Sequence, residues 1–146
     1  MTAIPFKTGS ILLLVGTKQG LFLLSSTDRQ HWQIEKTRLG DRSSYIYYAI
    51  FDPRKDYRLF ATNNGAHSSL CYSDDFGHRW QEPLKGMQFP QGVPPNEIWC
   101  IKPGQANEPG MVYAGTDPAC LWESHDWGEH WEVNEALLNY PGRDTW

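Results

Sequence analysis

The chain has 146 residues, the size of one domain, and its formal net charge is −4 at pH 7. This charge argues against polyanionic partners, so we expect binding to neither nucleic acid nor a membrane surface. Thirteen Gly and ten Pro interrupt helical patterns, whereas 14% aromatic residues, including seven Trp, favour β-strands.

The first third of the chain predicts three strands, over residues 11–17, 20–24 and 32–35. The apolar run 11–15 is too short for a membrane span or a signal-peptide core. We therefore expect a cytoplasmic protein.

Two further units repeat this order with one more strand at the start of each. Cys71, Cys100 and Cys120 lie on these strands without any C-x-x-C pair, which predicts buried free thiols rather than disulfides. The expected strands are 45–50, 58–62, 69–72 and 80–82 in the second unit, and 97–101, 111–116, 120–123 and 131–133 in the third.

One pattern, S-x-D-x-G-x-x-W, ends the third strand of both complete units, and residues 26–32 carry it with the Gly position deleted. It predicts a tight turn. The Asp carboxylate accepts hydrogen bonds from backbone N–H groups, and the Ser adds a second local hydrogen bond. The Gly supplies a position with positive φ. The Trp starts the next strand and buries its ring among apolar side chains. The expected structural residues are Ser26, Asp28, Trp32, Ser73, Asp75, Gly77, Trp80, Ser124, Asp126, Gly128 and Trp131.

A four-stranded unit of this length is typical of one β-propeller blade. We expect an all-β chain with blades over about residues 10–37, 45–83 and 97–134 and a connector over 135–146, the first blade lacking its first strand. Because propellers typically need 4–8 blades, three form an incomplete ring. The chain is then either a fragment of a six- to eight-bladed propeller or a unit that self-associates to complete one.

The motif resembles the Asp-box, or bacterial neuraminidase repeat, of sialidases, sortilin-type receptors and many bacterial propellers. The segment 115–124 and the Asn139-Tyr140-Pro141 tail look like the bacterial sialidase-like, glycosyl-hydrolase-like proteins with WD40/YVTN/BNR-like repeats. The resemblance implies a propeller whose Asp-box turns lie on the face away from any active site.

No complete catalytic constellation is recognisable. The motif carboxylates could act as general acids or metal ligands, but the turn itself uses their lone pairs. His125 and His130, spaced by five residues around Glu129, do not match a zinc-binding helix, so we expect no metal and no cofactor. The arginine triad that the resemblance to sialidases would imply is not recognisable either.

Ligand binding is expected on the face opposite the motif turns, where the connections 39–45, 63–67, 84–96 and 117–119 meet. The loop 89–95 is the best candidate for a lid or a partner surface. The polar candidates are Arg42, Tyr45, Asn63, Asn64, Glu97 and Asp117.

Three functional hypotheses remain open. The favoured one is a binding or scaffolding module, with a sugar-type ligand or a protein on the loop face. The second is part of an exo-alpha-sialidase or another glycoside hydrolase whose catalytic residues lie on other blades. The third is a protein-assembly factor.

Overall fold

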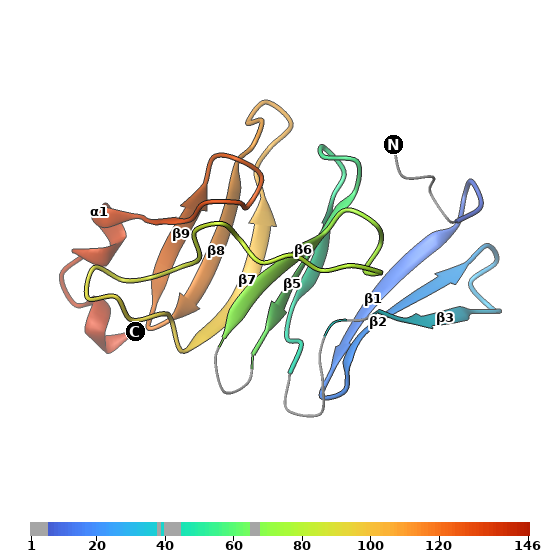
Figure 1. Ribbon diagram of the computed structural model, residues 1–146, viewed down its shortest axis with the longest axis horizontal. Coiled ribbons are helices and arrows are strands. Elements are labelled where there is room, and N and C mark those ends of the chain that lie inside the picture. Colours follow the sequence, from blue (N-terminus) through green and yellow to red (C-terminus); the bar gives the residue numbers. More distant parts are fainter. Residues whose placement is uncertain (1–5, 38, 40–44, 65–67) are drawn as a thin grey trace.

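Three antiparallel sheets stand side by side in chain order in the computed structural model, which describes residues 6–37, 39, 45–64 and 68–146 (Figure 1). The sheets follow one another from the blue N-terminal strands to the orange C-terminal ones. The first comprises β1 (Ile11–Thr17), β2 (Gly20–Ser26) and β3 (Gln33–Lys36); the second β4 (Ala49–Asp52), β5 (Arg58–Asn63) and β6 (Ser69–Ser73); the third β7 (Glu97–Pro103), β8 (Val112–Asp117), β9 (Cys120–Ser124) and β10 (Glu132–Val133). This arrangement confirms the expected all-β fold of consecutive propeller blades.

The third sheet has the expected four strands, in the order β10-β9-β8-β7. In the second sheet the expected strand over 80–82 is wrong: its place is taken by a single bridge between Tyr72 and Gln81, since Pro83 has no backbone N–H to extend the ladder. The expected strand over 45–50 begins only at Ala49, and Tyr45 forms an isolated bridge with Asn64.

Among the described residues, the first sheet has three strands in the order β1-β2-β3. Its strand β1 pairs with β2 in an unbroken antiparallel register from Ile11↔Ser26 to Thr17↔Gly20. Within the described residues, no strand pairs with the other edge of β1.

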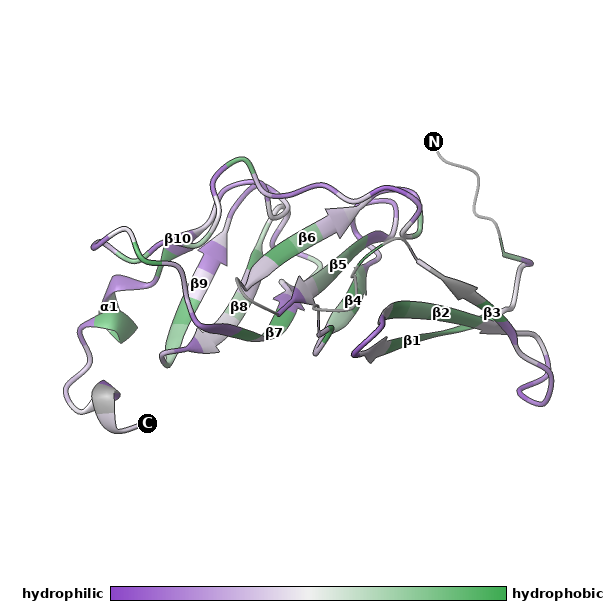
Figure 2. Ribbon diagram, turned by 60° about the horizontal axis from the view of Figure 1, so that its bottom comes forward, coloured by the Kyte–Doolittle hydropathy of each residue, from purple (hydrophilic) through white to green (hydrophobic). Residues whose placement is uncertain are grey.

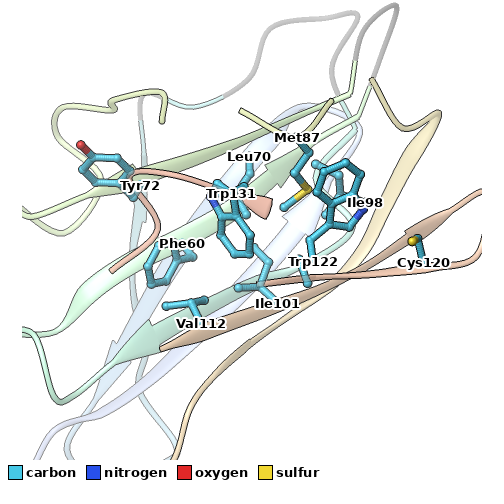
Figure 3. Packing of buried hydrophobic residues seen from close by; sticks show 11 residues of the cluster. Phe60, Leu70, Tyr72, Met87, Ile98, Ile101, Val112, Cys120, Trp122 and Trp131 are labelled. Carbon is cyan, nitrogen blue, oxygen red and sulfur yellow. The ribbon is translucent and has the colours of Figure 1, made fainter. Parts of the chain in front are cut away.

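Side chains of β5 alternate between two apolar layers, because successive residues of a strand point to opposite faces. Leu59 and Ala61 pack toward the first sheet, whereas Phe60 packs toward the third. The layer between the second and third sheets also holds Leu70, Tyr72, Met87, Ile98, Ile101, Val112, Ala114, Cys120, Trp122 and Trp131 (Figure 3). Apolar residues are concentrated on the strands, and the connecting turns are mostly hydrophilic (Figure 2).

The tail contains a short helix, α1 (Glu135–Leu138), and a single 3-10 turn, η1 (Arg143–Thr145), where the sequence suggested only a connector. Asn134 caps α1 by accepting the N–H of Leu137 at 3.0 Å. None of the described helices is long and apolar enough to span a membrane.

The three cysteines are free thiols, but only two are buried. Burial raises the pKa of Cys71 to about 11 and also raises the pKa of Cys120. The expectation of burial is wrong for Cys100, because the register between β7 and β8 shifts between Ile98 and Cys100 and breaks the alternation of inward and outward side chains.

Candidate functional site

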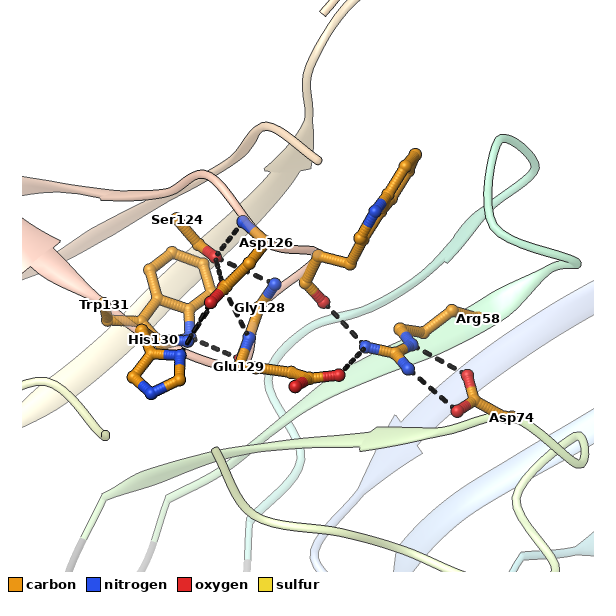
Figure 4. A network of polar contacts seen from close by, with 9 residues as sticks. Arg58, Asp74, Ser124, Asp126, Gly128, Glu129, His130 and Trp131 are labelled. Carbon is orange, nitrogen blue, oxygen red and sulfur yellow. Dashed lines mark hydrogen bonds and ion pairs between the residues drawn. The ribbon is translucent and has the colours of Figure 1, made fainter. Parts of the chain in front are cut away.

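The third S-x-D-x-G-x-x-W turn is a closed set of local hydrogen bonds (Figure 4). Asp126 Oδ1 accepts from Ser124 Oγ at 2.9 Å and from the N–H groups of Glu129 and His130 at 3.1 and 2.9 Å. Ser124 Oγ accepts the N–H of Gly128 at 2.9 Å, and His130 Nδ1 lies 2.6 Å from Asp126 Oδ2. Both carboxylate oxygens are therefore engaged within the turn, as expected for a structural residue.

The second turn repeats this geometry. Asp75 Oδ1 accepts from Ser73 Oγ at 2.9 Å and from the N–H of Arg79 at 2.8 Å. Gly77 has a φ of 86° and donates its N–H to Ser73 Oγ at 2.8 Å, while Trp80 Nε1 donates to the Gly77 carbonyl at 3.1 Å. The glycine thus supplies the left-handed conformation that the motif predicts.

The first turn closes with one residue fewer. Asp28 Oδ1 accepts the N–H groups of Gln30 and His31, both at 2.8 Å. Arg29, with a φ of 62°, donates its N–H to Ser26 Oγ at 2.8 Å and takes the place of the glycine. A missing glycine therefore leaves the hydrogen-bond scheme intact.

These hydrogen bonds keep the turn carboxylates ionised. The backbone N–H and ring of His31 hold the pKa of Asp28 well below its usual value. For Asp75 and Asp126, burial raises the pKa, but hydrogen bonds from Arg79 and His130 outweigh it, so each pKa is lowered. A group that stays ionised in this way is a poor general acid, and no cluster of His, Cys, Asp or Glu suited to a metal occurs among the described residues.

The turns also hold neighbouring sheets together. A Cβ placed on Gly128 would lie 2.6 Å from Phe60 Cε1 of the preceding sheet, and one on Gly77 would lie 2.7 Å from Thr37 Cγ2. The glycines therefore serve two purposes: they adopt the left-handed conformation and allow close contact between sheets.

Arg58 joins the second sheet to the third turn (Figure 4). Its side chain is only 5% exposed; Nε and Nη2 donate to the two Asp74 carboxylate oxygens at 2.7 and 2.9 Å. Nη1 donates to the Trp127 carbonyl at 3.0 Å, and the guanidinium lies over the Tyr72 ring, 4.2 Å from its centroid. With these contacts Arg58 is a structural residue.

The opposite end of the sheets holds the ligand-binding candidates, apart from Arg42, which lies outside the described residues. Asn64 is a structural link between sheets. Its Nδ2 donates to the Ile98 carbonyl and its Oδ1 accepts the Ile98 N–H, both at 3.3 Å. The backbone carbonyl of Tyr45 accepts a hydrogen bond from the Asn64 N–H at 2.8 Å. The Tyr45 side chain is exposed to solvent.

Two of the candidates, Asn63 and Glu97, carry buried oxygens, Oδ1 and Oε2, for which the described part of the chain provides no hydrogen-bond partner. Glu97 lies opposite Asp117 in the pairing of β7 with β8, and Asp117 Oδ2 accepts from Asn96 Nδ2 at 3.0 Å. Buried acceptors without donors are uncommon in folded proteins and are satisfied by water or by a ligand.

A row of exposed aromatic rings at this end contains two residues that the sequence reasoning missed. The Tyr45 and Tyr47 ring centroids are 6.3 Å apart; Tyr47 and Trp99 stack with centroids 5.5 Å apart and an interplanar angle of 6°. The three residues are 38%, 50% and 53% exposed, and Lys18 Nζ lies 5.7 Å from the Tyr45 ring centroid. We call Tyr45, Tyr47 and Trp99 the aromatic row.

Trp99 is exposed because it occupies the register shift in β7, next to Cys100. Regular alternation along a strand would not place both residues in solvent. The only sequence signal for the row is the run Tyr45-Ile46-Tyr47-Tyr48 ahead of β4, which is unusually rich in tyrosine.

The candidate lid, loop 89–95, belongs to a segment that packs along the sheets. The N–H of Lys85 donates to the Glu129 carbonyl at 3.0 Å, and Phe89 contacts Trp122 edge to face with centroids 5.1 Å apart. A cavity of about 180 Å³ lies beneath the segment, lined in part by Met87 and Leu70. The segment is therefore anchored at Lys85 and Phe89, whereas residues 90–94 of the candidate lid are exposed.

Chemically, the aromatic row can bind a planar or apolar group, and the unpaired acceptors can receive donors from a ligand. The described residues show no nucleophile hydrogen-bonded to a general base at this end of the sheets.

No protein-family model and no curated protein sequence matches this chain. Among solved structures, it is similar to the one described as YCF48 bound to D1 peptide, with 14% sequence identity and a TM-score of 0.49. That likeness covers 90% of this chain and 44% of the YCF48 chain, so this chain spans less than half of the length of YCF48.

Proposed function

We propose that this chain is part of an Asp-box β-propeller that acts as a non-catalytic binding module for a protein partner. The Asp-box assignment is supported by the three turns, in which Asp28, Asp75 and Asp126 accept equivalent backbone hydrogen bonds. The binding surface is the aromatic row at the opposite end of the sheets.

The observation that carries this proposal is the stacked pair of Tyr47 and Trp99, each about half exposed. Tyr and Trp are enriched at the centres of protein interfaces, because each covers a large area with few rotatable bonds. Ordered rings that face solvent bind a partner without further loss of side-chain entropy.

The two buried acceptors, Asn63 Oδ1 and Glu97 Oε2, favour a partner that brings hydrogen-bond donors. A polypeptide supplies such donors through its backbone N–H groups or through Lys and Arg side chains. A sugar supplies them through its hydroxyl groups, so a carbohydrate ligand is the second candidate for the same surface.

The proposal is tested by binding of the purified chain to a peptide array and to an oligosaccharide array. We expect peptide binding that is lost in Trp99→Ala and in Tyr47→Ala. It should be retained in the control Trp146→Ala, which removes a tryptophan that is 63% exposed in the tail.

Three outcomes would contradict the proposal. Peptide binding that survives Trp99→Ala would remove the aromatic row as the site. Binding to oligosaccharides alone would favour the carbohydrate candidate. Hydrolysis of a fluorogenic sialoside by the purified chain would favour the glycoside hydrolase alternative.

A further inference from the structure

The cavity of about 180 Å³ beneath the segment 84–95 contains no residue of the aromatic row. Its floor is apolar and buried, formed by residues that are each at most 7% exposed: Leu70, Met87, Ile98 and Trp131. These residues belong to the apolar layer between the second and third sheets, where Met87 lies beside Leu70 and close to the Trp131 ring (Figure 3). A ligand in the cavity would therefore lie against the core that joins the two sheets.

The mouth of the cavity is polar and carries one carboxylate. Glu82 and Gln88 line it and are exposed to solvent, and Ser69 is partly exposed. Glu82 takes part in none of the ion pairs among the described residues; Lys85, three residues further on, pairs instead with Glu132 at 3.9 Å. The mouth therefore offers a negative charge to a cation from outside the chain.

The size of the cavity suits a single aromatic ring. An apolar cavity of about 150 Å³ binds one benzene molecule, so a volume of about 180 Å³ also leaves room for a short substituent. Met87 offers a polarisable thioether and Trp131 an aromatic ring, and both make favourable contacts with a second ring. Water would find few hydrogen-bond partners on this floor, which favours an organic ligand.

We propose that this cavity is a binding site for a small aromatic amine, with its ring on the floor and its ammonium group at the Glu82 carboxylate. The apolar floor keeps the charge at the mouth, because an unpaired charge at the deep end would lose its hydration. The same carboxylate repels an acid of equal size. The site is separate from the aromatic row, so neither this proposal nor the proposed function depends on the other.

Met87 allows the site to be observed directly. It follows the motif residue Trp80 by seven positions, and in the first unit Leu39, which is also buried, follows Trp32 by seven. Met87→Leu therefore places at this position the residue that the first unit already has, with little change in volume. Because the chain has three methionines, methyl-13C methionine labelling gives three NMR signals, and the one lost in Met87→Leu reports on the cavity.

The probes are 2-phenylethylamine and the neutral 2-phenylethanol, which share the ring and differ in the charged group. We expect the amine to shift the Met87 methyl signal in a saturable manner, while the signal of Met111, which does not line the cavity, stays in place. Glu82→Gln should weaken binding of the amine about two- to fivefold, the contribution of an exposed ion pair, and leave binding of the alcohol unchanged. The matched control Glu135→Gln, which removes an exposed carboxylate from α1, should affect neither probe.

Two results would overturn the proposal. A Met87 signal that shifts without saturation, or only together with that of Met111, would mean that the cavity does not bind the ring. An affinity for the amine that Glu82→Gln leaves unchanged, or that falls equally for amine and alcohol, would mean that the carboxylate does not select a cation.

Discussion

Replacement of Gly128 by Ala tests whether the motif turns hold the sheets together. The new Cβ would lie 2.6 Å from Phe60 Cε1 and 3.2 Å from Phe60 Cζ. Phe60 is fully buried between the second and third sheets, so its ring has no free space into which it can move. The substitution therefore combines backbone strain with overpacking.

The two contributions can be separated with a matched control. A residue with a Cβ at a φ of 91° costs about 1–2 kcal/mol, and overpacking a dense core costs about 1–3 kcal/mol more. Gly92 provides the matched control: its φ is 77°, and a Cβ there would meet nothing within 4 Å. Gly92→Ala should therefore show the backbone strain alone.

The assay is urea unfolding followed by tryptophan fluorescence. We expect Gly128→Ala to lower the free energy of unfolding by about 1–3 kcal/mol more than Gly92→Ala does. Phe60→Leu should relieve the clash, so the two substitutions together should cost less than the sum of their separate effects. Equal costs for the two glycine variants, or simple additivity with Phe60→Leu, would refute this account of the turns.

Three further predictions follow from the polar contacts and the thiols. Asp74→Ala should cost about 1–3 kcal/mol, because the buried Arg58 guanidinium loses both of the carboxylate oxygens that accept from Nε and Nη2 and keeps only the Trp127 carbonyl and the Glu129 carboxylate, 3.6 Å away. The control Glu132→Ala, which breaks an exposed ion pair, should cost under about 1 kcal/mol, and similar costs in thermal unfolding would contradict the first expectation. Because the folded-state pKa of Asp126 is lowered, its contribution to stability is present above the unfolded-state pKa, near 4, and is lost as the pH falls through the folded-state value. The stability difference between wild type and Asp126→Asn, measured by urea unfolding, should thus shrink as the pH falls from about 5 to about 2; a difference independent of pH would argue against it. A thiol reagent should modify Cys100 rapidly and the two buried thiols only on unfolding, and a rapid phase that persists in Cys100→Ser would be inconsistent with the fold.

The motif turns could be predicted from the sequence because their contacts are local. Asp126 and its hydrogen-bonding partners lie within six residues of one another, so the spacing of Ser, Asp and Gly is enough to specify them. The order of the strands followed from the same repeat. The three strands of the first unit were also predictable, because the same succession of two strands, a motif turn and a last strand recurs in the third unit.

The aromatic row could not be predicted because it depends on contacts between sheets. Trp99 reaches solvent through a register shift that the apolar run 98–101 does not reveal. Tyr47 belongs to a segment that looks like a strand but forms only an isolated bridge. Asn64 was expected to face a ligand; its amide instead pairs with the backbone of Ile98, thirty-four residues away.

The contacts of Gly77 with Thr37 and of Gly128 with Phe60 run in the same direction, each from a motif turn back to the sheet that precedes it in the chain. Each joint thus pairs a motif turn with the unit that precedes it in the chain. The receiving residues are not equivalent, because Thr37 directly follows β3 whereas Phe60 lies in β5. A gene duplication that copied one unit would therefore copy the glycine side of the joint, and the receiving side would have to adapt to it, so the two ends of such an array are never equivalent.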